Sequence, residues 1–236
     1  MKIRVLATGS TRKERLMRRW GVSFLIDDDV LFDTFGDPAV LMENMKKMNV
    51  AAQKIKHIVL SHDHWDHTGG LRGISPLCNK PRAYIHAGFS EAIKRTVEEA
   101  RAELIQVKDI ARIKENVLVT GPISGYYNKT PILEQALLYE RDTALSLITG
   151  CAHPGITRII THLTGRLQKP ISLIFGGFHL KDFSCEYIEE MIAQMKSLGV
   201  KKAAPTHCTG ELATHLLREK FGKHFIKVEE GQEYCL

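Results

Sequence analysis

The chain has 236 residues, 44% of them apolar and 25% charged, proportions that indicate a globular protein with a hydrophobic core. No apolar run of about 18 residues occurs, which argues against a membrane-spanning helix. Lysine and arginine outnumber aspartate and glutamate by 33 to 27, and the resulting charge of +6 is compatible with nucleic acid or phosphorylated small molecules as ligands.

Short apolar runs rich in β-branched residues alternate with helical patterns from the N-terminus onward. In the first half the predicted strands are residues 3–7, 22–26, 30–33, 57–60 and 82–86. A helix is predicted to begin at Asp37, because a proline follows at the first helical turn. A charged helix is predicted over residues 90–103.

In the second half, residues 132–139 and 143–149 are predicted to form a hairpin that turns at residues 140–142. Strands over 144–149, 171–175 and 200–205 are each followed by a histidine-containing loop and a helix, the last two helices covering residues 184–197 and 211–221. This alternation predicts an α/β fold. No repeat or linker divides the chain, so we expect a single domain over residues 1–236.

Loops with histidines follow four of the predicted strands, around residues 62–67, 153, 179 and 207. In α/β architectures, ligands bind where the loops at the carboxyl ends of strands converge. We therefore expect these four loops to meet at one site.

The densest set of potential ligands lies at Ser61–Gly70, in the sequence SHDHWDHTGG. His62, His64, Asp66 and His67 offer the nitrogen and oxygen ligands that suit zinc, iron or manganese. If the loop is extended, alternate residues face one cavity, and the following Thr-Gly-Gly turns His67 elsewhere. Two adjacent ions are then predicted, one on His62 and His64 and one on Asp66 and His67. Such a site can lower the pKa of a bound water to about 7.

Four ligands are too few for two ions, so further ligands are expected from later loops. His153 in TGCAHPGI and His207 in PTHCTG are the predicted additional metal ligands. For His179 in GGFHL, a substrate contact, proton transfer and metal ligation all remain open. The candidate catalytic residues are Asp66 and His179.

The five cysteines are odd in number, scattered and without a Cys-x-x-Cys pair, and the N-terminus lacks an apolar secretory segment. No disulfide framework is expected, and a reducing cytoplasm is the predicted location. Cys151 and Cys208 adjoin predicted ligand loops, but buried structural cysteines are the favoured interpretation and ligation is the alternative. The remaining histidines lack such context and are interpreted as ordinary core or surface residues: His57, His86, His162, His215 and His224.

The histidine motif, in SHDHWDHTGGL, resembles the H-x-H-x-D-H signature of the metallo-β-lactamase superfamily, whose fold is a four-layer αβ/βα sandwich. The preceding FLIDDDVLFDTFGD resembles the second and third strands of that superfamily, with Asp33 at its DTG-like turn. Five later stretches are similar to the subfamily named for 7,8-dihydropterin-6-methyl-4-(β-D-ribofuranosyl)aminobenzene 5′-phosphate synthase. These stretches are, in order, VTGPI, EQALLY, TGCAHPGI, GGFHL and PTHCTG.

The resemblance implies a metal-dependent enzyme with one or two divalent ions, zinc being favoured over manganese or iron. It implies that His62, His64, Asp66 and His67 are metal ligands, that His207 takes the place of the superfamily's last histidine, and that His153 is the ligand of the TGC-x-H loop. Two departures stand out. Cys151 occupies the position of a usual bridging aspartate, and the usual third-motif histidine has no clear counterpart between residues 121 and 133. His153 is the candidate replacement for one of them, so one-metal and two-metal sites both stay open.

The favoured function is metal-dependent hydrolysis, or synthase-like group transfer, on a phosphorylated or diphosphate-bearing small molecule. Arg12–Arg19 is the densest basic stretch and a candidate phosphate contact, although a solvated face explains such runs more often. A nuclease of the same fold is the alternative, disfavoured because aromatics are only 7% and unclustered. A redox module holding iron would need a flavin partner domain, which 236 residues do not accommodate. Neither membrane nor nucleic acid is an expected partner.

Overall fold

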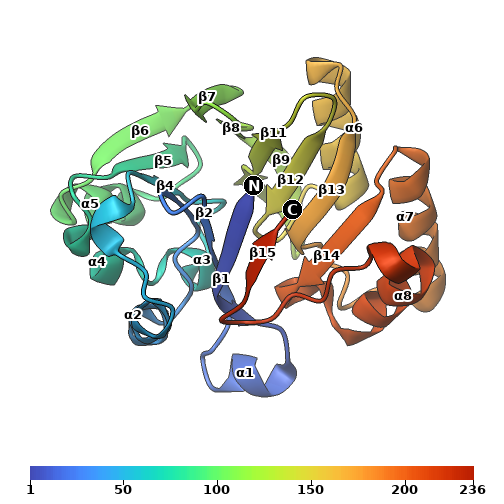
Figure 1. The fold of residues 1–236 in the computed structure, drawn as a ribbon, viewed down its shortest axis with the longest axis horizontal. Helices are drawn as coiled ribbons and strands as arrows, with labels where there is room; N and C mark the ends of the chain where they lie inside the picture. Colours follow the sequence, from blue (N-terminus) through green and yellow to red (C-terminus); the bar gives the residue numbers. More distant parts are fainter. The chain divides into compact units, whose positions relative to one another are not determined.

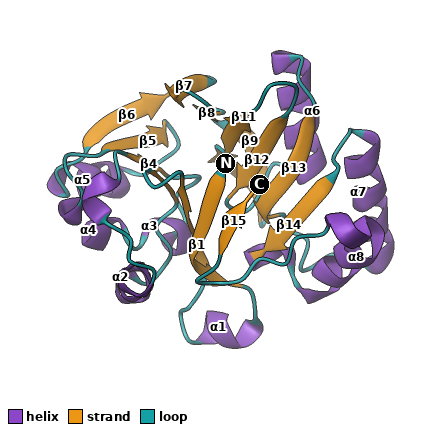
Figure 2. Ribbon diagram, in the orientation of Figure 1, coloured by secondary structure: helices purple, strands orange, loops and turns teal.

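The computed structural model describes residues 1–236, which form two compact units (Figure 1). Unit 1 comprises Met1–Asp109 and Glu229–Leu236, and unit 2 comprises Ile110–Val228. Each unit contains a β-sheet and helices, which confirms the α/β class (Figure 2). The assignment of residues 1–236 to one domain stays a prediction.

Unit 1 is built on a seven-stranded sheet in the order β15-β1-β2-β3-β4-β5-β6. The strands β1, β2, β3 and β15 pair antiparallel, whereas β3, β4, β5 and β6 run parallel. The carboxyl ends of β3, β4 and β5 therefore lie at the same edge. The strands are β1 Lys2–Gly9, β2 Gly21–Ile26, β3 Val30–Phe32, β4 His57–Val59, β5 Arg82–His86, β6 Glu103–Val107 and β15 Glu233–Cys235.

Three helices of unit 1, α2, α4 and α5, bury apolar residues against this sheet. Leu41 of α2, Leu71 of α4 and Val97 of α5 share one core with Ile58 of β4, and this packing removes apolar surface from water. Asp37 caps α2 by accepting a hydrogen bond from the backbone N–H of Ala39 at 2.8 Å. The helices are α1 Arg12–Leu16, α2 Pro38–Lys47, α3 Trp65–Thr68, α4 Leu71–Ile74 and α5 Glu91–Glu99.

Unit 2 contains a six-stranded sheet in the order β14-β13-β12-β11-β8-β7, together with the separate hairpin β9–β10. Strands β12, β13 and β14 are parallel, and β11 pairs antiparallel with both β12 and β8. The strands are β7 Ala111–Lys114, β8 Val117–Val119, β9 Ile123–Tyr127, β10 Thr130–Glu134, β11 Leu137–Glu140, β12 Leu145–Thr149, β13 Ile171–Gly177 and β14 Lys202–Thr206.

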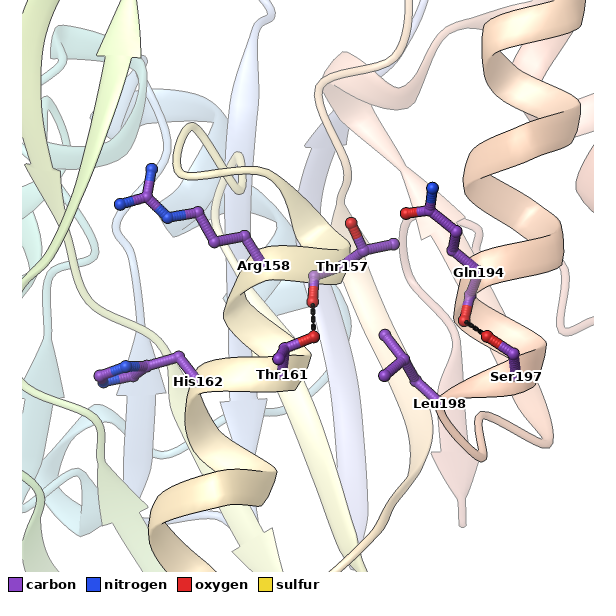
Figure 3. Close-up of a pocket in the computed structure, with 7 residues that line it drawn as sticks. All are labelled: Thr157, Arg158, Thr161, His162, Gln194, Ser197 and Leu198. Carbon is purple, nitrogen blue, oxygen red and sulfur yellow. Dashed lines mark hydrogen bonds between the residues drawn. The ribbon is translucent and has the colours of Figure 1, made fainter.

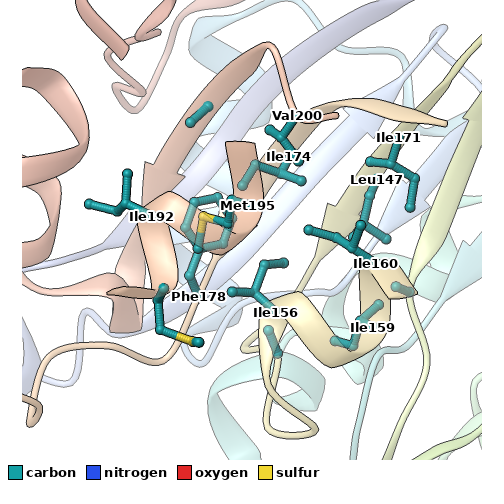
Figure 4. Close-up of a cluster of buried hydrophobic side chains, with 14 of the residues drawn as sticks. Leu147, Ile156, Ile159, Ile160, Ile171, Ile174, Phe178, Ile192, Met195 and Val200 are labelled. Atoms are coloured by element: carbon teal, nitrogen blue, oxygen red, sulfur yellow. The ribbon is translucent and has the colours of Figure 1, made fainter. Parts of the chain in front are cut away.

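The core of unit 2 lies between this sheet and the helices α6 Ile156–Leu167, α7 Cys185–Ser197 and α8 Glu211–Phe221. Figure 4 shows Leu147 of β12, Ile174 of β13, Ile160 of α6 and Met195 of α7 within this cluster. All four side chains are fully buried. The parallel strands β12, β13 and β14 are thus supported on this face by close-packed apolar side chains.

Most of the predicted elements are present close to the predicted bounds. The strand over residues 82–86 and the helix over residues 211–221 have the predicted limits, and α7 begins after Ser184, whose side chain accepts a hydrogen bond from Tyr187 N. The hairpin that turns at residues 140–142 is confirmed by the antiparallel pairing of β11 with β12.

Two predictions about elements are wrong. A single strand over residues 132–139 is absent, because β10 pairs with β9 while β11 joins the six-stranded sheet. The helix predicted over residues 90–103 ends at Glu99: Arg101 adopts a φ of 59°, and β6 begins at Glu103. In addition, the sequence did not predict β6–β9 or β15; β6, β7, β9 and β15 are short strands with exposed positions, and β8 has only three residues, all buried.

None of the five cysteines forms a disulfide, as the sequence predicted. No helix of the structure is both long enough and apolar enough to cross a membrane.

Truncating Leu147 tests the core of unit 2. Leu147 is 0% exposed, whereas Leu212 of α8 is 46% exposed. We expect Leu147→Ala to lower the free energy of unfolding by about 2–5 kcal/mol through lost burial and a residual cavity. The matched Leu212→Ala should change it by about 0.5 kcal/mol or less. Urea unfolding followed by circular dichroism measures both, and equal losses would contradict the packing described.

Candidate metal centre

Unit 1 carries the first group of potential ligands, here called the N-terminal cluster. Its members follow β3 and β4 at their carboxyl ends, where the strands run parallel. All are buried except His64, which is half-buried. The cluster consists of Asp33, Ser61, His62, His64, Asp66 and His67.

The structure places the four predicted ligands of this cluster close together. His62 Nε2 and His64 Nδ1 are 3.1 Å apart, and the rings of His62 and His67 are 4.1 Å apart between centroids. Asp66 Oδ2 lies 3.6 Å from His67 Nε2. Two nitrogens bound to one tetrahedral zinc ion are separated by about 3.3 Å, so the donor set and its spacing fit a divalent ion.

The path of the backbone through this motif differs from the predicted extended loop. His64 is extended, with φ −104° and ψ 145°, but helix α3 begins directly after it at Trp65. Strand-like alternation therefore stops at His64, and the prediction that alternation directs Asp66 toward the cavity is wrong. Asp66 and His67 are instead presented by the first turn of a helix.

Asp33 fixes the orientation of the His67 ring through its Nδ1 atom. Its Oδ2 lies 2.6 Å from His67 Nδ1, and its two oxygens accept hydrogen bonds from the backbone N–H and the hydroxyl of Ser61, both at 2.7 Å. Burial raises the pKa of Asp33, and the charge and hydrogen bonds of His67 and Ser61 offset only part of that rise. Because Nδ1 of His67 is engaged, Nε2 is the nitrogen that a metal ion would take.

Unit 2 carries the second group, here called the C-terminal cluster. Glu134 is the last residue of β10, and the other members follow β12, β13 and β14, which are parallel neighbours. All are buried except the half-buried His179. The cluster consists of Glu134, Cys151, His153, His179, His207 and Cys208.

Glu134 organises the loop that carries His153. Its carboxylate accepts hydrogen bonds from the backbone N–H groups of Cys151, Ala152 and His153 at 2.8–2.9 Å, and it lies 2.8 Å from His153 Nδ1. Burial alone would raise the pKa of Glu134, but these hydrogen bonds and the His153 charge lower it to about 2. Glu134 therefore fixes both the loop and the orientation of the imidazole.

The thiols and imidazoles of the C-terminal cluster lie close enough to one another to bind a shared metal ion. The ligand atoms of Cys151, His153 and His179 all lie within 4.8 Å of one another, and so do those of Cys151, His207 and Cys208. His179 Nδ1 is buried and makes no hydrogen bond. Thiolate donors favour zinc over magnesium or calcium. The ligand role of the two cysteines, the less favoured interpretation of the sequence, thus has a structural basis.

Unusual backbone conformations accompany these side chains. His179 and His207 have φ of 51° and 54°, in the left-handed region that non-glycine residues rarely adopt. A Cβ atom on Gly177 would lie 2.3 Å from Gly150 O and 2.7 Å from Cys208 Sγ. The second glycine of GGFHL therefore serves the close approach of β13 to the loop after β12.

Sequence reasoning did not identify Asp33 and Glu134 as members of these clusters. Both residues lie in stretches that the sequence singled out, FDTFGD and EQALLY. The available signal is the placement of a lone carboxylate at the end of a short apolar strand. Its partner histidine lies 34 residues away for Asp33 and 19 residues away for Glu134, so spacing along the chain could not pair them.

The five histidines interpreted as ordinary lie outside both clusters. His57 Nδ1 is 2.9 Å from the Tyr84 hydroxyl, and His215 pairs with Glu219 on α8. His162 lines a cavity of about 530 Å³ between α6 and α7, together with threonines and Gln194 (Figure 3). No group of potential metal ligands gathers at that cavity.

Residues 21–162 match the family described as the Metallo-beta-lactamase superfamily, a span that includes the whole N-terminal cluster and His153. The chain belongs to the metallo-β-lactamase superfamily.

Relatives within the superfamily cover nearly the whole chain. The chain is 28% identical to the 7,8-dihydropterin-6-methyl-4-(β-D-ribofuranosyl)-aminobenzene-5′-phosphate synthase of Methanocaldococcus jannaschii, over 90% of this chain and 88% of that protein. An uncharacterized protein of the same organism is 25% identical over 85% of this chain and 88% of its own length. These similarities confirm the resemblance predicted from the sequence motifs.

Solved structures confirm the fold. A metal-dependent hydrolase of the beta-lactamase superfamily superimposes with a TM-score of 0.78 at 24% identity, over 100% of this chain and 99% of that one. Human tRNase Z, short form, does so with a TM-score of 0.64 at 17% identity, over 100% and 99%. At these identities the likeness establishes the metallo-β-lactamase fold and no particular activity.

Neutralising Glu134 should make the stability of the protein depend differently on pH. Its carboxylate has a pKa of about 2 in the fold against an ordinary 4.5, so its stabilising contribution is complete above pH 4.5 and is lost as the pH falls toward 2. In metal-free protein, Glu134→Gln should lower the free energy of unfolding by about 2 kcal/mol or more at pH 7, and by less at about pH 3.5. Urea unfolding at several pH values measures this difference.

The exposed Glu115 of unit 2 offers a matched control. Glu115→Gln should change the stability little at either pH. A Glu134→Gln deficit that stays constant down to about pH 3.5 would contradict the role described for this carboxylate.

Proposed function

We propose that this chain is a metal-dependent enzyme that acts on a phosphorylated or diphosphate-bearing small molecule. The proposed metal ligands are His62, His64, Asp66, His67, His153 and His207, with one or two divalent ions, zinc being preferred over manganese or iron. Asp66 and His179 are the proposed catalytic residues. A cytoplasmic location is part of the same proposal.

One observation supports the metal assignment most strongly. His67 and His153, from separate loops, each have Nδ1 within 2.8 Å of a buried carboxylate. Histidines that ligate metals commonly engage a carboxylate in this way, which fixes the ring and leaves Nε2 as the ligand atom. The superfamily membership of the chain is consistent with this arrangement.

The proposed chemistry divides between the ion and the protein. A divalent ion, when bound, supplies charge neutralisation for phosphate oxygens and lowers the pKa of a coordinated water to about 7. Asp33 and Glu134 hold the imidazoles of His67 and His153 in fixed orientations. Asp66 offers a carboxylate oxygen near His67, and the buried Nδ1 of His179 can bind a substrate oxygen or carry a proton.

Hydrolysis and group transfer use the same proposed site and differ in the attacking group. In hydrolysis of a phosphoester, a water oxygen forms the new bond to phosphorus and loses a proton, while the bond from phosphorus to the alcohol oxygen breaks and the alcohol leaves protonated. In transfer, an amine nitrogen forms the new bond to the carbon that carries the diphosphate and loses a proton, while the carbon–oxygen bond breaks and diphosphate leaves. The relative from Methanocaldococcus jannaschii is named a synthase and supports transfer, while the metal-ligand motif of this chain is equally suited to hydrolysis.

Removing a proposed ligand tests the metal site. We expect His64→Ala and Asp66→Ala to reduce bound zinc and to lower turnover by more than about 100-fold. Removing a metal ligand lowers metal affinity and activity more than removing a residue that hydrogen-bonds to the ligand, which typically lowers them about 10- to 100-fold. Metal content by mass spectrometry and turnover are measured on the same samples. His215→Ala on the exposed face of α8 is the control and should retain both. Normal metal content and turnover in both ligand variants would overturn the assignment.

A substrate panel separates the reaction types. The purified protein, loaded with zinc, manganese or iron(II), is offered phosphoesters, lactones and a pterin methyl diphosphate with an arylamine. Amine-dependent release of diphosphate would identify transfer, and release from an ester by water alone would identify hydrolysis. Cleavage of RNA with steep salt dependence would favour the nuclease alternative instead. An iron absorption band in the protein as purified, with no turnover of any substrate, would favour the redox alternative.

A further inference from the structure

Unit 1 has an open cavity of about 930 Å³ between helix α1 and the segment that follows β3. Three arginines of the α1 region line it: Arg12, Arg15 and Arg18. The opposite wall is formed by Gly36, Asp37, Pro38 and the indole of Trp65. Trp65 lies between His64 and Asp66 in the sequence, so one residue of the metal-ligand motif forms part of the cavity wall.

The cavity has an excess of positive charge. None of its three arginines forms an ion pair, whereas Arg19 of the same segment pairs with Glu230 at 2.9 Å. The one acidic side chain in the lining is Asp37, whose carboxylate already accepts the hydrogen bond that caps α2. Guanidinium groups bind phosphate oxygens through paired hydrogen bonds, so this lining suits a phosphate.

Trp65 adds a flat apolar surface to the same cavity. Its side chain is 52% exposed although it lies in a buried motif. The ring is held in place from one side: a Cβ atom on Gly36 would lie 2.4 Å from Trp65 Cζ3. Leu16, which is 78% exposed, lines the cavity as well. An indole fixed against backbone and open to solvent is a surface on which an aromatic ring can stack.

We infer that this cavity binds a phosphorylated small molecule that carries an aromatic or heteroaromatic ring. The arginines take the phosphate and Trp65 stacks on the ring. The inference rests on the proposed function, because it makes Trp65 the link between the substrate pocket and the metal-ligand motif. A concave pocket of this volume favours a small molecule over nucleic acid, which is bound along extended basic tracks.

Calorimetric titration of the full-length protein with three probes tests the inference. The probes are phenylphosphonate, methylphosphonate and inorganic phosphate, each added with EDTA present and again with zinc present. We expect phenylphosphonate to bind about tenfold more tightly than methylphosphonate, and to do so with or without zinc. Arg12→Ala, Arg15→Ala and Arg18→Ala should each weaken phenylphosphonate binding about tenfold or more.

Lys13→Ala is the matched control, because Lys13 is an exposed cation of the same helix that does not line the cavity. It should change the affinity by less than about twofold. Trp65→Ala should remove the preference for the phenyl group without weakening methylphosphonate, and Trp65→Phe should restore part of it. The metal content of each variant shows whether the adjoining motif is intact.

The outcomes separate this inference from the proposed function. Equal losses in Lys13→Ala and the arginine variants, or no preference for the phenyl probe, would overturn the pocket while leaving the metal results untouched. If phenylphosphonate binding is weakened by the arginine variants but the protein takes up no metal, the proposed function would be overturned while the assignment of the cavity would hold. A single-stranded RNA that binds more tightly than phenylphosphonate and weakens equally in Lys13→Ala would overturn the small-molecule assignment.

Discussion

Two buried carboxylates each engage the Nδ1 atom of a histidine, and the remaining features of the candidate site depend on these pairs. Asp33 lies 2.6 Å from His67 Nδ1, and Glu134 lies 2.8 Å from His153 Nδ1. Removing a carboxylate from water is costly unless hydrogen bonds replace its hydration. Ser61 supplies two of those bonds to Asp33, and the backbone of residues 151–153 supplies three to Glu134. The hydrogen bonds that these buried carboxylates accept therefore fix the conformation of both loops.

Irregular backbone conformations accompany the residues of both clusters. Asp33, Ala152, His179 and His207 adopt positive φ values between 51° and 61°. Such conformations cost on the order of 1–3 kcal/mol each and persist where surrounding contacts over-determine them. Ala152, His179 and His207 lie in the loops that follow β12, β13 and β14, and these strands pack against the helices of unit 2. Part of the backbone strain of this chain therefore lies within the candidate site, at Asp33, His179 and His207.

The arginine-lined cavity gives α1 a role that the rest of unit 1 does not require. This helix has five residues, buries none of them and contributes nothing to the core of its unit. It is fixed locally by the Thr11–Glu14 capping box. Arg15 lies over the ring of Trp20 at 5.6 Å, but none of the three arginines that line the cavity forms an ion pair. A capped helix that buries no residue and presents such arginines beside an exposed tryptophan is explained more readily by ligand binding than by stability.

The sequence determined the features that depend on local pattern. Short apolar runs placed β1–β5, because these strands are largely buried, and the strand–loop–helix pattern placed α7 and α8. The H-x-H-x-D-H spacing identified the superfamily because it lies in one continuous stretch. It also indicated His153 and His207, since both follow strands of a repeating strand–loop–helix pattern. It erred where backbone geometry changes within a motif, as at Trp65, and where a strand's partner lies in another sheet, as at β10 and β11.

Only the tertiary structure decided the interactions between residues far apart in the chain. The pairing of Asp33 with His67 spans 34 residues, that of Glu134 with His153 spans 19, and the proximity of Cys151 to Cys208 spans 57. The cavity joining Arg12–Arg18 to Trp65 is of the same kind. Burial, hydrogen-bond satisfaction and charge at such sites are properties of the packed chain, because loops that are distant in sequence meet only when the sheets bring their strands into register.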